Sequence, residues 1–260
     1  MTNDKKVKKL FAAVATLGLA LAATVGSTYA WFSMNSTVTA TNMKVKVEAQ
    51  KNLLITTTSG SYVGGPTTVD LSIDKDTLVP TSCDATQPSL NWYKVKNSTG
   101  INFSSGAKGD DTTFQTASAT EGDYVKTTFY IKSVGEGAES LRAAVSVMAG
   151  GGGTHIVDRA YRVLVVVDAE GASRKVYAPI AGHSTGYYTI KGVDVNDKPQ
   201  MSTGTVTPDV ADNVILAELE ADTEYTVDVY IWCEGQDDAC TSLNAVSLTP
   251  TTFQIALTVE

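Results

Sequence analysis

Histidine and cysteine are scarce in this chain, which narrows the chemistry that it can perform. Its 260 residues include two histidines and three cysteines. A zinc site usually needs four nitrogen or sulfur ligands, and no H-E-x-x-H motif of a metalloprotease is present. The sequence therefore predicts no metal site and no bound cofactor.

One short motif resembles the nucleophile elbow of hydrolases. Residues 182–186 read Gly-His-Ser-Thr-Gly and match the pattern G-x-S-x-G. That elbow needs a helix after the serine and a catalytic histidine later in the chain. Strand-like sequence follows here instead, and the other histidine, His155, lies upstream. We interpret the motif as a turn and expect neither catalytic residues nor enzyme activity.

Basic residues are outnumbered by acidic ones. The chain carries 20 Lys and Arg against 28 Asp and Glu, which gives a formal net charge of −8. Such a chain lacks the positive patch that binds the phosphate backbone of nucleic acid. Nucleic acid is therefore not an expected partner.

The first 30 residues have the pattern of a secretory signal peptide. Lysines at positions 5, 6, 8 and 9 precede an apolar run from residue 10 to residue 25, and Thr28-Tyr29-Ala30 supplies small residues before a cleavage site. We expect a hydrophobic signal helix over residues 1–30, cut by signal peptidase between Ala30 and Trp31. The alternative is an uncleaved membrane anchor, because residues 10–32 barely reach across a bilayer core of about 30 Å. Both readings place the remaining chain outside the cell, secreted or at the cell surface.

Alternating apolar and polar residues recur along the rest of the chain, while amphipathic helices are missing. Period-two alternation predicts half-buried strands, and the apolar run at 161–167 predicts a strand buried on both faces. We expect an all-β fold, a jelly-roll-like antiparallel β-sandwich over residues 50–260, with a loop-rich insertion at about 59–122. The expected strands are residues 43–48, 53–55, 125–131, 141–147, 161–167, 225–231 and 253–259, with shorter strands at 175–178, 186–190 and 214–219.

The three cysteines form an odd set. Cys233 and Cys240 bracket the acidic loop EGQDDA, and a disulfide between them would close a hairpin. Cys83 is left over, and the sequence leaves open whether it is buried, free or paired between molecules.

Two stretches carry a resemblance to a known family. Residues 26–32 read GSTYAWF and are followed by VTATNM and a lysine-bearing strand, and Glu121-Gly122-Asp123 precedes two strands separated by a glycine-rich turn. These stretches resemble the TasA/camelysin family of secreted bacterial proteins. The resemblance implies a jelly-roll sandwich whose N-terminal strand completes the neighbouring subunit and so builds extracellular matrix fibres.

Residues 31–49, the N-terminal extended segment, fit such a donor strand on physical grounds as well. They are extended in pattern and apolar at intervals, and a strand added to an exposed sheet edge supplies both main-chain hydrogen bonds and side chains. The expected partner is therefore another copy of the chain, head to tail, with an accessory or anchoring subunit as a further expected partner. The expected donor side chains are Trp31, Phe32, Met34, Val38, Met43 and Val45.

A different class of function stays open at this point. A monomeric surface-binding module, such as an adhesin or a glycan binder, would use exposed aromatic side chains as platforms. The candidates are Trp92, Tyr93, Tyr187 and Tyr188. Aromatic residues of this kind are more often part of a core or a sheet face.

Overall fold

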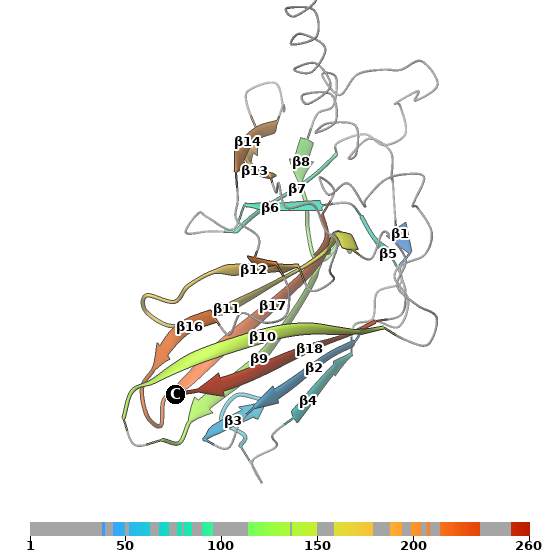
Figure 1. The fold of residues 1–260 in the computed structure, drawn as a ribbon. Coiled ribbons are helices and arrows are strands. Elements are labelled where there is room, and N and C mark those ends of the chain that lie inside the picture. The colour runs from blue at the N-terminus through green and yellow to red at the C-terminus, as the bar shows by residue number, and fades with distance from the viewer. Residues whose placement is uncertain are drawn as a thin grey trace, which may run out of the picture.

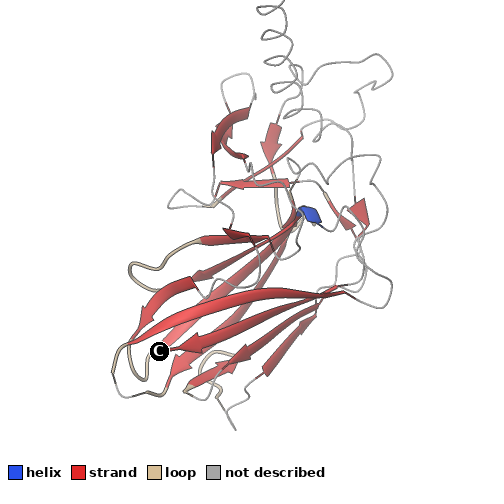
Figure 2. Ribbon diagram, in the orientation of Figure 1, coloured by secondary structure: helices blue, strands red, loops and turns tan. Residues whose placement is uncertain are grey.

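A computed structural model describes about half of the chain, and most of that part is β-structure (Figure 2). Apart from a short helical turn at residues 159–160, the described residues outside the strands are turns and loops. In these described residues, no helix is long and apolar enough to cross a membrane. The described residues are 38–39, 44–49, 52–62, 68–72, 77–79, 81–84, 90–95, 114–135, 137–149, 159–178, 188–193, 199–203, 207–208, 214–234 and 251–260.

The first of two large sheets has five strands and places an early strand of the chain, β2, beside the last one, β18. Its order is β16 (Val214–Leu219), β10 (Glu139–Ala149), β18 (Thr251–Val259), β2 (Lys44–Ala49) and β4 (Thr68–Ser72). Neighbouring strands are antiparallel except β2 and β18, which run parallel, with Val45 opposite Phe253. In Figure 1 the blue β2 lies beside the red β18.

The second large sheet has six strands. Its order is β15 (Thr207–Pro208), β12 (Lys175–Ala178), β11 (Tyr161–Val167), β17 (Glu224–Cys233), β9 (Val125–Ser133) and β3 (Leu53–Thr56). All pairs are antiparallel except β12 and β15. Strands β9 and β17 bury alternate apolar residues against the first sheet, and the continuously apolar strand β11 turns Tyr161, Val163 and Val165 the same way.

The two sheets pack face to face around one apolar core, so the protein is an all-β sandwich. Tyr161 of β11 meets Phe253 of β18 edge to face, with ring centroids 5.0 Å apart. The Tyr177 hydroxyl donates a hydrogen bond across the core to the carbonyl of Ala143, at 3.4 Å. The alternation expected at residues 43–48, 125–131, 141–147, 225–231 and 253–259 corresponds to β2, β9, β10, β17 and β18.

Three small sheets lie beside the sandwich (Figure 1). They are the three-stranded sheet β6 (Thr81–Asp84), β7 (Asn91–Val95) and β8 (Phe114–Thr116), and the pairs β13 (Tyr188–Val193) with β14 (Pro199–Thr203) and β1 (Val38–Thr39) with β5 (Thr77–Leu78). The expected insertion at 59–122 thus contributes β4 to the sandwich itself and a separate three-stranded sheet.

The three-stranded sheet covers part of the outer face of the six-stranded sheet. A second apolar cluster forms there, in which Trp92 of β7 packs with Leu164 of β11 and Trp232 of β17. This packing explains why β11 is buried on both faces, as its continuous apolar sequence predicts.

Candidate functional site

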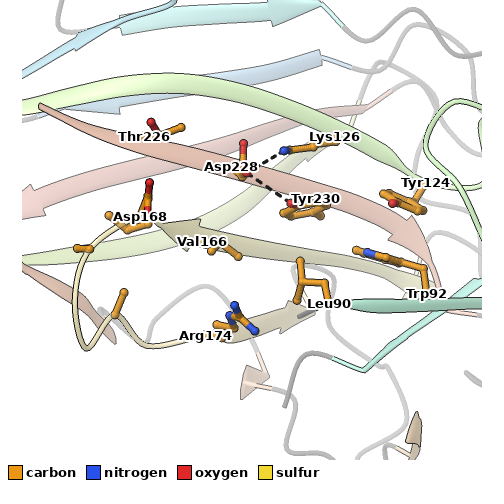
Figure 3. Close-up of a pocket in the computed structure, with 13 residues that line it drawn as sticks. Leu90, Trp92, Tyr124, Lys126, Val166, Asp168, Arg174, Thr226, Asp228 and Tyr230 are labelled. Atoms are coloured by element: carbon orange, nitrogen blue, oxygen red, sulfur yellow. Dashed lines mark hydrogen bonds and ion pairs between the residues drawn. The ribbon is translucent and has the colours of Figure 1, made fainter. Parts of the chain in front are cut away.

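A cleft of about 640 Å³ lies on the outer face of the six-stranded sheet (Figure 3). Its floor comes from β9, β17 and β11, and the remaining sides come from the turn between β11 and β12 and from residues 90–92 of the three-stranded sheet. Its volume lies within the range of about 300–1,000 Å³ that is typical of small-molecule sites.

The alternation of β9 and β17 decides which side chains face this cleft. Residues 227, 229 and 231 of β17 point into the core, so Thr226, Asp228 and Tyr230 point outward. Lys126 of β9 lies directly opposite Tyr230 in the strand register. Four polar or aromatic side chains therefore meet on two neighbouring strands.

Aromatic rings form one end of the cleft. Trp92 stacks on Tyr124, with ring centroids 3.9 Å apart and planes 13° apart. Trp232 meets Trp92 edge to face at 5.2 Å, and Tyr230 lies 5.5 Å from Trp92. Trp92 is buried, whereas Tyr124 and Tyr230 keep part of their surface exposed. Burial raises the pKa of both tyrosine hydroxyls, so both stay protonated at neutral pH.

A hydrogen-bonded ion pair lies next to these rings. The Lys126 ammonium is 2.9 Å from Asp228 Oδ2 and 5.6 Å from the centre of the Tyr230 ring. Asp228 also accepts hydrogen bonds from the Thr128 hydroxyl at 2.6 Å and from the Tyr230 hydroxyl at 3.4 Å. The hydrogen bond to Asp228 raises the pKa of Lys126, so the ammonium group stays charged at neutral pH.

A second acid and base line the same cleft beyond the ion pair. Asp168 follows β11, and Arg174 precedes β12 at the other end of the same turn. The lining therefore contains two cations and two carboxylates, and their formal charges cancel. Rigid rings, hydrogen-bond donors and acceptors together suit a binding site for a small or extended ligand.

The Glu121-Gly122-Asp123 motif has a structural role close to this cleft. Lys94 of β7 lies 2.7 Å from Asp123 and 2.5 Å from Glu121. Asp123 is buried, and its carboxylate also accepts a hydrogen bond from the backbone N–H of Ser118 at 2.8 Å. The motif therefore fixes the three-stranded sheet to the start of β9.

Several residues singled out from the sequence lie outside the described residues. They are the expected cleavage site Ala30 and Trp31, the donor residues Phe32, Met34 and Met43, the elbow-like motif at 182–186, Tyr187, and Cys240. The expected disulfide therefore stays a prediction, with Cys233 buried in the sandwich core at the end of β17.

The structure locates two of the expected donor residues. Val38 belongs to β1, which pairs with β5 and is part of neither large sheet. Val45 lies in β2 with its side chain fully buried in the core of its own chain. Within this chain, the strand that carries Val45 is thus an internal strand of the sandwich.

The aromatic platforms expected for a binding module are only partly brought together. Trp92 is in the cleft, but mostly buried as a supporting ring, and Tyr93 next to it is on the opposite side of β7. Sequence reasoning did not single out Tyr124, Asp228 or Tyr230. The alternation of β17 signals that Asp228 and Tyr230 face outward, whereas the cleft itself depends on how the three-stranded sheet packs.

Comparison with known proteins provides no assignment, since neither a family model nor a curated protein matches this sequence. Among the described residues, no group of three or more His, Cys, Asp or Glu side chains is arranged to hold a metal ion.

Proposed function

We propose that this protein is a structural subunit of an extracellular filament, in a biofilm matrix or on a cell surface. In this proposal the part of the N-terminal extended segment before β2 leaves its own subunit and adds as a strand to the next one. Residues 1–30 direct export and are removed by signal peptidase, and the sandwich has the jelly-roll topology that the resemblance to the TasA/camelysin family implies.

The position of β2 carries this proposal. β2 begins at Lys44 and lies between β18 and β4, and among the described residues neither large sheet contains a residue before Lys44. Within the described part of the chain, β2 is the first strand along the sequence that belongs to either large sheet. Residues 31–42 lie directly before this strand and are apolar at intervals, which suits a segment that adds as a strand to another copy.

The sandwich also has strand edges to which a segment could add. β3 and β4 are the last strands of their sheets and lie next to each other at one side of the sandwich (Figure 1). At the opposite edge of the first sheet, the carbonyl of Leu216 in β16 already accepts a hydrogen bond from the backbone N–H of Ser173, at 2.6 Å. Adding a strand from another copy joins two different surfaces, so the contact repeats and a filament grows.

Electron microscopy of the mature chain, residues 31–260, tests the proposal. We expect filaments at rising protein concentration, and we expect a chain of residues 38–260, which keeps β1, to stay monomeric. The triple variant Trp31→Ser, Phe32→Ser, Met34→Ser should behave like the truncated chain. The matched variant Ser33→Ala, Asn35→Ala, Ser36→Ala changes the intervening residues and should still form filaments. Filaments of residues 38–260 would refute the proposal.

A further inference from the structure

The aromatic end of the cleft is already ordered before any ligand binds. Trp92 is held on one face by Tyr124 and at its edge by Trp232, at centroid distances of 3.9 and 5.2 Å. Tyr124 and Tyr230 turn partly exposed rings toward the cleft. A ligand that stacks on these rings does not have to order them, so little conformational entropy is lost on binding.

Polar groups lie within reach of a ligand on those rings. Thr226, Asp228 and Lys126 project from the floor beside Tyr230 (Figure 3). A carboxylate accepts hydrogen bonds, an ammonium donates them, and a threonine hydroxyl does both. Alcohol groups on a ligand also do both, so they match this mixed set of partners better than groups that only accept or only donate.

The charges of the cleft exclude two other kinds of ligand. Lys126 is neutralised by Asp228 at 2.9 Å, the two further charged residues Asp168 and Arg174 cancel, and the chain as a whole is acidic. An anion such as a phosphate is therefore not attracted. A purely apolar ligand would remove water from the ion pair without replacing its hydrogen bonds, which costs free energy.

We propose that the cleft binds a neutral oligosaccharide. Sugar rings combine an apolar C–H face, which packs on aromatic rings, with hydroxyl groups around the edge, and the cleft presents partners for both. Its volume of about 640 Å³ accommodates a short stretch of a glycan chain. This binding activity does not depend on the filament proposed above, because it uses the outer face of the six-stranded sheet and no residue before Leu90.

Isothermal titration calorimetry of the mature chain tests this inference. The probes are cellotetraose, chitotetraose and maltotetraose as neutral chains, and a heparin-derived tetrasaccharide as an anionic one. We expect at least one neutral probe to bind, and the heparin fragment not to bind. Binding of the neutral probe should also change the tryptophan fluorescence of the protein, measured separately. The inference would be overturned if none of the neutral probes bound at 10 mM ligand, a concentration on the order of the weakest specific affinities. It would also be overturned if the heparin fragment bound more tightly than the neutral probes.

Variants locate the binding in the cleft. Tyr230→Ala should weaken binding of the neutral probe at least tenfold, and Asp228→Asn, which keeps the shape of the side chain, should weaken it by a similar factor. Tyr130→Ala is the matched control, because Tyr130 is on the same face of β9 as Lys126 but does not line the cleft. Circular dichroism confirms that each variant is folded. Unchanged affinity in a folded Asp228→Asn variant, or an equal loss in Tyr130→Ala, would contradict the assignment.

Discussion

At the scale of single residues, Asp123 shows how one buried carboxylate joins two parts of the molecule. It is 1% exposed, and it pairs with Lys94 from β7 while accepting the N–H of Ser118. Gly122 before it has a φ of +83°, a left-handed conformation that glycine adopts without strain. Burial opposes the charge on Lys94, but hydrogen bonds to Asp123 and Glu121 outweigh it and raise the pKa of Lys94.

Removing this carboxylate should therefore be costly. Asp123→Ala leaves Lys94 without its buried partner, and we expect the free energy of unfolding to fall by about 3 kcal/mol. Glu121 also contacts Lys94 but is mostly exposed, so Glu121→Ala should cost less than about 1 kcal/mol. Urea denaturation of both variants measures the difference. Equal losses in the two would show that burial of Asp123 is not what makes the contact strong.

The carboxylate of Glu224 should make the stability of the fold depend on pH. The Ser59 hydroxyl, at 2.6 Å, and the Gly60 N–H, at 2.8 Å, both donate to Glu224, and they lower its pKa below the ordinary value of 4.5. Because the folded pKa is depressed, the stabilisation is present above pH 4.5 and is lost as the pH falls through the folded pKa.

Thermal melts at several pH values below 4.5 test this linkage. The wild-type melting temperature should fall more steeply than that of Glu224→Gln, which cannot ionise. Asp222→Asn provides the control for removing an exposed charge from the same turn. Parallel curves for the wild type and Glu224→Gln would contradict the assignment.

At the scale of elements, the sequence predicts where the strands lie along the chain better than it predicts which strands pair with one another. Period-two alternation identifies β9, β10, β17 and β18, because each has one face in the core. Residues 175–178 and 214–219 also coincide with β12 and β16. The parallel pairing of β2 with β18 could not be read from the chain, because alternation says which face is buried and not which distant strand lies alongside.

The cleft, too, depends on contacts between distant segments that the sequence does not reveal. The outward direction of Asp228 and Tyr230 follows from the alternation of β17, and the run YRVLVVV indicates that something covers the outer face of β11. The segment that covers it, with Trp92 at its centre, was expected only as an irregular insertion. Short strands separated by turns carry too weak a pattern to predict where they pack.

The outer face of β11 provides a test at this scale. Leu164 points away from the sandwich core but is fully buried under the three-stranded sheet. We expect Leu164→Ala to lower the free energy of unfolding by about 2–5 kcal/mol, the range for a buried leucine. Ile215→Ala on β16 is the control, because this side chain is 40% exposed, and it should cost much less. A small loss for Leu164→Ala would mean that the three-stranded sheet does not pack on β11 in solution.

At the scale of the whole molecule, the sandwich separates two possible activities of one chain. The proposed contacts between copies use strand edges and the residues before β2, whereas the proposed ligand site lies on the outer face of a sheet. The net charge of −8 is consistent with both proposals, because a net charge favours solubility and repels anionic partners. The proposed exchange uses residues before β2, whereas the cleft is lined only by residues from Leu90 to Tyr230, so the two proposals can be tested separately.

The boundary between the exchanged residues and the core is itself a prediction. A chain of residues 38–260 keeps β1 and β2, and we expect it to unfold cooperatively as a soluble monomer. A synthetic peptide of residues 31–42 should raise its melting temperature, since a ligand that binds only the folded state stabilises it by about 2.7 kcal/mol at 100 times its Kd.

A peptide of residues 44–49 should have no effect, because the chain's own β2 already fills the place between β18 and β4. Val47→Asp in the same truncated chain should prevent folding, since Val47 is fully buried and a charge there has no partner. Stabilisation by the 44–49 peptide rather than by the 31–42 peptide would move the exchange into β2 and contradict an exchanged segment that ends before Lys44.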